Sequence, residues 1–430
     1  MRTLGKLCVL LLMVSTAGLA QETTSADQAQ LLKSLVERVN ALEQEVQQLK
    51  EQNRQLQNQP APPATPAQTA AAPSTTNPVV TTAVQQAVHD HTAAELPEVN
   101  ESYPNLKIRG FANIDYSETD TKTQPSGFTM GQFVLHFSSA LSRKTSFFGE
   151  LSFTAQQSNY SADVERAIIR YDLNDHLKVS FGRYHTPINY WNTAFHHGAW
   201  LQTTISRPEM IRFGGRFLPV HFVGALAEGT IPSGPLGLNY NFGVGNGRQS
   251  ITLLSRDGDP GDVNGSRAIV GSVFARPASI EGLQFGGAFY KDKISPDANS
   301  VTQSRFNEWI ASGHIAYERE SPEILAEFSH VRHNDILTGR TWDSQGAYAQ
   351  VAYRLPWANK KFKPYYRFEY IHIPGGEPVL LIPELKAGHT LGTRYDITDF
   401  AAFKVEYRNW RRDIPADRWN GFFAQTAFTF

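Results

Sequence analysis

Residues 420–430 read NGFFAQTAFTF, and this stretch decides the fold class. Phe422, Ala424, Thr426, Phe428 and Phe430 occupy every second position. A period of two residues places alternate side chains on opposite faces of an extended strand. The stretch therefore predicts a β-strand with one aromatic face, and the last residue of the chain lies on that face.

The same alternation begins at Leu106 and recurs to the end of the chain. About sixteen segments carry it, and each is close to the roughly 9–11 residues that a tilted membrane strand requires. They fall at 106–116, 132–138, 150–154, 166–171, 177–181, 220–227, 236–245, 267–276, 283–290, 308–318, 324–332, 346–354, 362–372, 390–397, 401–410 and 420–430. The predicted fold is an all-β transmembrane, about 16-stranded antiparallel outer-membrane barrel over residues 105–430.

The connections between these segments alternate in length, as expected when tight turns lie on one side of a membrane and long loops on the other. Short connections fall at 142–145, 173–176, 319–323 and 398–399. Long connections fall at 248–266, 291–305, 333–344, 374–388 and 411–418. An even strand count leaves both ends of the barrel in the periplasm. Tyr116, Tyr171, Tyr317, Tyr353, Tyr370 and Tyr407 end apolar faces and predict aromatic girdles at the lipid interface.

The composition agrees with a membrane barrel, and the net charge gives no reason to expect a polyanionic partner. Aromatic residues make up 11% of the chain, yet the mean hydropathy is −0.36. That combination is expected where lipid-facing and water-facing residues alternate. The formal net charge is −1, so the total gives no reason to expect a nucleic-acid partner.

The first twenty residues have the pattern of an export signal. Arg2 and Lys6 precede a short apolar run from Leu7 to Ala17, and Gly18-Leu19-Ala20 offers a small-residue cleavage site before Gln21. The run is too short to span a bilayer. We expect residues 1–20 to be a signal peptide, whose removal also removes Cys8, the one cysteine of the chain.

A heptad repeat follows, and residues 21–58 are expected to form a periplasmic coiled coil. Its apolar seam sets oligomerisation, through Leu35, Val39, Leu42, Val46, Leu49, Asn53 and Leu56. Arg38 faces Glu43 and Glu45 faces Lys50, pairs that attract only between parallel chains in register. The a and d residues favour two strands by the general rule for coiled coils, but the sequence leaves the choice between two and three strands open.

Residues 59–104 are rich in Pro, Ala, Thr and Gln and predict an extended linker. His89-Asp90-His91 lies within it. A metal site there would need a further ligand and a rigid frame, and neither is visible, so no metal site is predicted.

The longest connection runs from about Arg183 to Arg216 and stands at the third outer loop of a sixteen-strand barrel. Residues 185–208 are predicted to fold inward as a constriction. Cationic groups in a narrow aqueous pore favour anions, which gives a set of pore-lining or constriction candidates. They are Arg109, Arg166, Arg170, Arg183, His196, His197, Arg207, Arg212, Arg216, Arg367, Arg394 and Arg408.

The residues give little reason to expect an enzyme, and no catalytic residue, metal or cofactor is predicted. His196 and His197 are not at helical spacing, and no carboxylate lies at an obvious ligand offset. Residues 243–247 are glycine-rich but end a strand rather than open a helix, so a phosphate cradle is not expected. A barrel hydrolase would need a Ser–His pair on the wall and is the third class considered.

Several stretches together resemble trimeric Gram-negative porins. They are Leu106-Lys107-Ile108-Arg109-Gly110-Phe111, Arg166-Ala167-Ile168-Ile169-Arg170-Tyr171, Phe181-Gly182-Arg183 with Pro187, Tyr240 to Gly247, and Phe430. The likeness is to phosphate-selective-type porins and to porins with N-terminal periplasmic coiled coils, including sugar porins. It implies homotrimers and passive diffusion of small hydrophilic solutes. A terminal aromatic residue such as Phe430 resembles the signal that the barrel assembly machinery recognises.

The resulting expectation is a porin in the cell outer membrane, surrounded by lipid, with its stalk in the periplasm. No cofactor is expected, and the solute is not defined by the sequence. The rival is a structural envelope tether whose stalk binds peptidoglycan or a periplasmic partner. Deletion of residues 21–100 separates the two, since a channel would still conduct.

Overall fold

A computed structural model of the chain describes Gln44 and residues 103–430, except 122–125, 157–158, 213–216, 249–258, 260, 262–264, 296–304, 381–384 and 413–417. The predicted signal peptide, the coiled coil with its seam from Leu35 to Leu56, and nearly all of the linker lie outside the described residues, as does Arg216.

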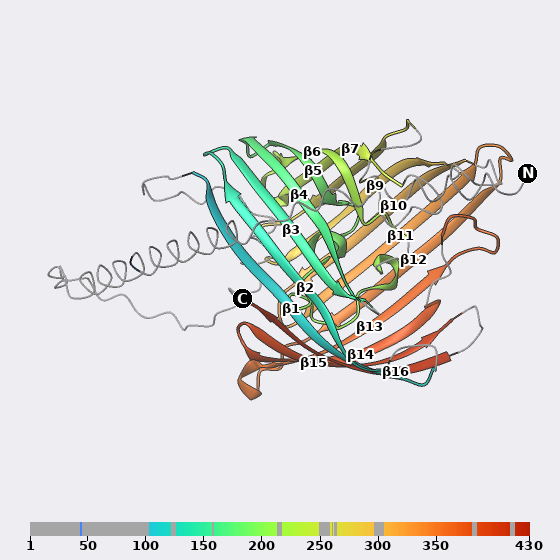
Figure 1. Cartoon of the computed structure of the whole chain (residues 1–430). Helices are drawn as coiled ribbons and strands as arrows, with labels where there is room; N and C mark the ends of the chain where they lie inside the picture. Colours follow the sequence, from blue (N-terminus) through green and yellow to red (C-terminus); the bar gives the residue numbers. More distant parts are fainter. Residues whose placement is uncertain are drawn as a thin grey trace, which may run out of the picture. The chain divides into compact units, whose positions relative to one another are not determined.

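The described residues form sixteen β-strands that close into one antiparallel barrel, each strand paired with its neighbours in the chain (Figure 1). The strands are β1 (Asn105–Thr119), β2 (Gly127–Ala140), β3 (Thr145–Ala155), β4 (Tyr160–Asn174), β5 (Leu177–His185), β6 (His221–Ile231), β7 (Leu238–Asn246), β8 (Ala268–Ala275), β9 (Leu283–Ile294), β10 (Phe306–Glu318), β11 (Glu323–Asp335), β12 (Thr341–Ala352), β13 (Phe362–His372), β14 (Ala387–Thr398), β15 (Ala401–Arg411) and β16 (Arg418–Thr429). The predicted fold class and strand number are confirmed.

The barrel closes where the first and last strands meet. β1 pairs antiparallel with β16, with Phe111 opposite Thr429. The Phe430 amide then donates to the Gly110 carbonyl at 3.0 Å. The Phe430 ring lies over Gly110, where a β-carbon would come within 2.4 Å of it, and stacks on Phe133 at 5.7 Å between centroids. Glycine at position 110 thus makes room for the terminal aromatic side chain that completes the seam.

The outer face of the barrel is apolar and exposed. Large apolar side chains stand on it from every part of the wall, as the alternation predicts. Examples are Leu106, Ile108, Phe128, Ile169, Phe181, Phe242, Ile315, Phe328, Leu391 and Phe422. Tyr171, Tyr353, Tyr370 and Tyr407 of the predicted girdles are also exposed. Such a surface suits hydrocarbon rather than water.

The connections alternate between short turns and longer loops. The longest, residues 186–220, joins β5 to β6. The connection expected at 333–344 is shorter, because β11 and β12 stay paired as far as Asn334 and Thr341. Only residues 336–340 are left between those two strands. Polar residues at the strand ends hide this extension from a pattern that depends on apolar alternation.

Helical structure among the described barrel residues is confined to connections. α4 (Tyr190–Ala194) and the 3₁₀ turns η1 (Glu209–Ile211), η2 (Gly234–Leu236) and η3 (Ala358–Lys360) are each a turn or so long. Within the part of the chain that the structure describes, no helix combines the length and the apolar character needed to cross a bilayer.

Candidate functional site

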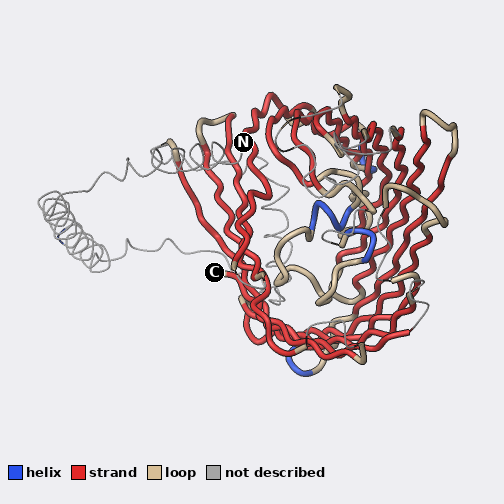
Figure 2. Tube along the Cα trace, turned by 45° about the vertical axis from the view of Figure 1, so that its right-hand side comes forward, coloured by secondary structure: helices blue, strands red, loops and turns tan. Residues whose placement is uncertain are grey.

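The connection between β5 and β6 folds into the barrel rather than away from it. The described residues of this connection, 186–212 and 217–220, lie with α4 and η1 within the ring of strands in Figure 2. We call them the inward segment. Its apolar side chains form the centre of the largest cluster of buried residues, among them Trp191, Phe195, Trp200 and Met210. The barrel interior is therefore partly filled by the chain itself.

Three glutamates of the facing wall hold the inward segment by its backbone. Glu327 of β11 accepts from the Trp191 amide at 2.6 Å and from the Asn189 side chain at 2.8 Å. Glu369 of β13 accepts from the Glu209 amide at 2.6 Å. A hydrogen bond contributes about 0.5–1.5 kcal/mol to stability, and one to an ionised carboxylate about 1.5–3 kcal/mol.

The third glutamate continues the same row. Glu406 of β15 accepts from the Ile205 amide at 2.9 Å and also from the Tyr365 hydroxyl at 2.9 Å. One of the three acids therefore stands on each of β11, β13 and β15, which are every second strand of this wall. They bind amides of the inward segment from Trp191 to Glu209.

Cations on β13–β15 bind carbonyls of the same segment. Arg367 donates to the Ser206 carbonyl at 2.8 Å, and Arg394 donates to the Trp200 carbonyl at 2.6 Å. Lys404 donates to the Thr204 carbonyl at 3.0 Å. Sequence reasoning did not single out Lys404, since nothing local marks its partner 200 residues away.

The predicted cationic candidates thus divide into groups with different surroundings. Arg367 and Arg394 are buried against the inward segment, and Arg408 pairs with Glu406 at 2.6 Å. Arg212 pairs with Glu209 at 2.9 Å inside the segment, and Arg207 donates to the His196 carbonyl at 2.6 Å. Arg109 is exposed near the start of β1.

A cavity of about 280 Å³ lies beside the segment, against the wall formed by β3–β10. Four of the residues that line it are basic and two are acidic, and the lining also includes Tyr190 and His314, whose rings stack at 5.7 Å between centroids. The charged lining residues are Arg166, Arg170, Lys178, Arg276, Asp175 and Glu228. Two predicted candidates, Arg166 and Arg170, therefore line open space.

The two arginines are also held by acids. Arg170 lies 2.8 Å from Asp172 and 3.4 Å from Glu228, while Arg166 lies 2.5 Å from buried Glu150. These pairs fix the two guanidinium groups in position. Lys178 and Arg276 then give the cavity lining an excess of basic groups over acidic ones.

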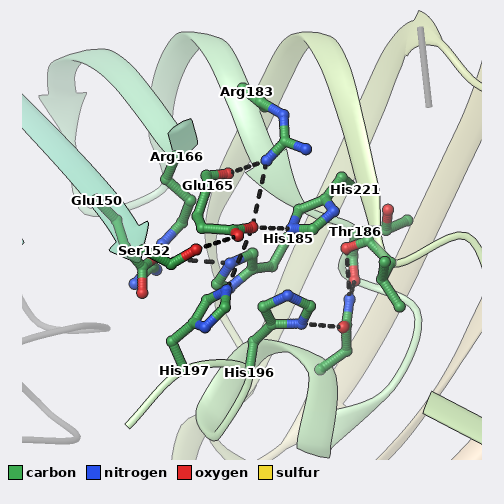
Figure 3. Close-up of polar contacts among 12 residues, drawn as sticks. Glu150, Ser152, Glu165, Arg166, Arg183, His185, Thr186, His196, His197 and His221 are labelled. Atoms are coloured by element: carbon green, nitrogen blue, oxygen red, sulfur yellow. Dashed lines mark hydrogen bonds and ion pairs between the residues drawn. The ribbon is translucent and has the colours of Figure 1, made fainter. Parts of the chain in front are cut away.

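Four histidines gather where β4, β5 and β6 meet the inward segment (Figure 3), and His185 among them also lines the cavity. His185 ends β5 and lies opposite His221, which begins β6. His196 and His197 come from the inward segment, and Gly198 (φ +106°) lets the chain turn directly after them. Burial, followed by the repulsion that a protonated His185 would exert, holds the pKa of His196 well below its usual range.

Glu165 of β4 is the acid of this group. It lies 3.2 Å from His197 and 3.0 Å from His221, and it accepts from the Ser152 hydroxyl at 2.7 Å. Arg183, a predicted candidate, lies 3.6 Å from Glu165 and 2.7 Å from Asp259. Sequence reasoning named His196, His197 and Arg183 but missed Glu165, His185 and His221 as parts of one group.

Together, the closed barrel, its apolar outer face, its charged inner face and its inward third outer connection define the fold of an outer-membrane porin. No protein-family model matches the sequence, and no curated protein matches it.

Solved structures of bacterial porins share the fold at low sequence identity. An anion-selective porin from Comamonas acidovorans is similar with a TM-score of 0.56 and 11% identity, over 76% of this chain and 100% of its own. OmpF of Salmonella typhi, solved with daunomycin, is similar with a TM-score of 0.51 and 13% identity, over 76% and 97%. A loop-deleted OmpT, an outer membrane protein of Vibrio cholerae, gives a TM-score of 0.52 and 13% identity over 76% and 100%.

Proposed function

We propose that this chain forms a water-filled channel in the outer membrane through which small hydrophilic solutes diffuse passively, with a preference for anions. The observation that carries the proposal is the cavity beside the inward segment, lined by Arg166, Arg170, Lys178 and Arg276 against two acids. Basic groups in a confined aqueous space lower the barrier for anions and raise it for cations. The similar Comamonas protein is named as an anion-selective porin, which supports the same direction.

The inward segment would act as the constriction. It lies against β11–β15, where Glu327, Glu369 and Glu406 accept hydrogen bonds from its backbone amides. Solutes would then pass between the segment and the β3–β10 wall. Residues 185–208 would set the size limit.

The assembly we propose is a homotrimer surrounded by outer-membrane lipid. One of the similar Vibrio cholerae OmpT structures is described as a trimer form. The heptad seam at 21–58 would join the chains in the periplasm and would contact peptidoglycan there. The barrel assembly machinery would recognise Phe430. We assign the chain a channel role and no catalytic one.

Conductance across a planar bilayer tests this function. Purified full-length protein should insert in discrete current steps, and a salt gradient should give a reversal potential of the sign expected for anion preference. A folded barrel that stays silent would overturn the channel, and a cation-type reversal potential would overturn the anion preference alone.

A further inference from the structure

Five buried side chains converge where β4, β5 and β6 meet the inward segment. Glu165, His185, His196, His197 and His221 each offer one ligand atom, and these five atoms all lie within 4.8 Å of one another. We call this group the His–Glu cluster. Its members come from three neighbouring strands and from the inward segment, so their meeting is a product of the fold (Figure 3).

Hydrogen bonds outside the cluster orient two of the rings. His196 Nδ1 lies 2.9 Å from Asn192 Oδ1, and His197 Nδ1 lies 3.3 Å from Gln132 Oε1. An amide oxygen only accepts, so each Nδ1 must donate, and in the neutral form of each ring the lone pair is then on Nε2. Metal-binding histidines are held in the same way, by a donor bond from the nitrogen that does not coordinate.

The spacing of the donor atoms matches a coordination shell. His197 Nε2 and His221 Nε2 lie 3.2 Å and 3.0 Å from the same carboxylate oxygen, Glu165 Oε2. A tetrahedral zinc site with bonds of about 2.0–2.1 Å has edges of about 3.3 Å between its ligand atoms. A small inward or outward adjustment of these side chains would therefore place an ion between them.

His185 is the second indication of a ligand. The side chain is buried, and within the described residues neither of its ring nitrogens makes a hydrogen bond. Its ring centroid lies 4.0 Å from that of His196, and its Nε2 is 3.6 Å from Glu150 Oε2. A buried polar group left in this state calls for a physical explanation, and a bound ion supplies one.

Packing alone is the simpler alternative, since neutral histidines can fill a protein interior. It explains the ring contacts of 4.6 Å that His196 makes with His197 and His221. It does not explain why Nε2 atoms and a carboxylate oxygen point to one place, or why His185 lacks a hydrogen bond there.

We infer that the His–Glu cluster binds one divalent transition-metal ion, and that Zn²⁺ fits it best. Imidazole with one carboxylate suits Zn²⁺, Ni²⁺ or Cu²⁺, whereas Mg²⁺ and Ca²⁺ favour oxygen ligands. Four or five protein ligands leave no open position for a substrate, so the ion would be structural. It would join His185 and His221, which flank the inward segment, to His196 and His197 within the segment and to Glu165 of β4.

Metal titration of the untagged full-length protein tests the site. After treatment with a chelator, wild-type protein should bind one Zn²⁺ per chain by calorimetry, and Co²⁺ should give visible absorption bands typical of nitrogen ligands. H196Q and E165Q should abolish or strongly weaken both signals. Q132A, which removes only the support of His197, should weaken binding by about 10–100-fold.

Two control variants separate this cluster from other histidines. The double variant H89Q/H91Q removes the His-Asp-His motif of the linker, and H330Q removes a partly exposed histidine of β11 that pairs with Asp343. Both should retain one ion per chain. Binding that disappears with H89Q/H91Q would overturn the assignment.

Folding is checked by the heat-dependent mobility of the barrel on gels, so loss of metal is not confused with loss of structure. Wild-type protein that binds no stoichiometric Zn²⁺ and gives no Co²⁺ bands would overturn the proposal. So would folded H196Q and E165Q proteins that bind as wild type does. Because conductance is not the readout, failure here leaves the channel proposal unaffected.

Discussion

Two walls of the same barrel use the same kinds of side chain for opposite purposes. On β11–β15, the inward acids and bases bind amides and carbonyls of the inward segment and are buried. On β4–β8, inward bases line open space. Alternation along a strand places a charge inside the barrel. Whether that charge faces the lumen depends on which wall the inward segment covers.

Loss of a single charge should lower the stability of the protein more on β11–β15, the wall that the inward segment covers, than elsewhere on the barrel. In R367A, Glu369 loses a partner at 2.8 Å, and the Ser206 carbonyl loses its donor. Removing one member of a buried pair costs about 3–5 kcal/mol. We expect that loss of unfolding free energy in urea denaturation followed by tryptophan fluorescence, together with noisier current steps.

The matched control for R367A is R332A on β11. Arg332 pairs with Asp343 at 2.7 Å, but its side chain is 52% exposed. Exposed pairs contribute about 0–1 kcal/mol. Equal losses in the two variants would contradict the view that burial by the inward segment gives Arg367 its importance.

Two turns, one between β10 and β11 and one between β8 and β9, should differ in how much they contribute to stability as the pH falls. Burial alone raises the pKa of Glu320, but Lys363 and Arg354, at 3.0 Å and 2.6 Å, outweigh it and lower the pKa from 4.5 to about 2. A carboxyl group with a lowered pKa in the folded state stabilises the protein above pH 4.5 and loses that contribution as the pH falls toward 2. Solvent screening reduces the contribution to about 2 kcal/mol.

E320Q should therefore lower stability near pH 7 and flatten its fall between pH 4.5 and 2, measured by thermal unfolding across that range. The control is E281Q, in the turn between β8 and β9, because Glu281 is 83% exposed beside Arg319. Stability of E281Q should follow the wild type. An E320Q profile parallel to the wild type would refute the ion-pair explanation.

The smallest effect concerns ion selectivity. Arg170 lines the cavity, whereas Arg394 is buried beneath the carbonyls of Trp200 and Gln202. A charge about 4 Å from a passing ion in water contributes about 1 kcal/mol, or about fivefold in permeability. R170Q should lower the anion-to-cation permeability ratio by up to about fivefold in reversal-potential measurements. R394Q should leave the ratio unchanged, and an equal shift in both variants would contradict the division between the walls.

The strands could be predicted from the sequence because their signal is local. Alternation at 362–372 defines β13 to the residue, since both faces are marked along its whole length. β12 was expected at 346–354 and begins at Thr341, because its outer end pairs through polar residues that carry no apolar pattern.

The site was harder to predict from the sequence than the strands, because its contacts join distant parts of the chain. The length of the connection between β5 and β6 indicated a segment able to fold inward. Which wall it contacts depends on bonds such as Ile205 to Glu406, separated by 201 residues. The His–Glu cluster was missed because ligand spacing was sought along the chain. His185 and His221 are brought together by strand register, and pairing the end of one predicted strand with the start of the next could have found them.

The row of glutamates on β11, β13 and β15 has a consequence for engineering. These acids bind the inward segment chiefly by its main-chain amides, which every residue except proline possesses. Side chains that face the cavity, such as Thr193 and Tyr190, can therefore be exchanged while Glu327, Glu369 and Glu406 keep their hold. The barrel could therefore serve as a constant scaffold, and the selectivity of its channel could be changed by substituting a few residues of the inward segment.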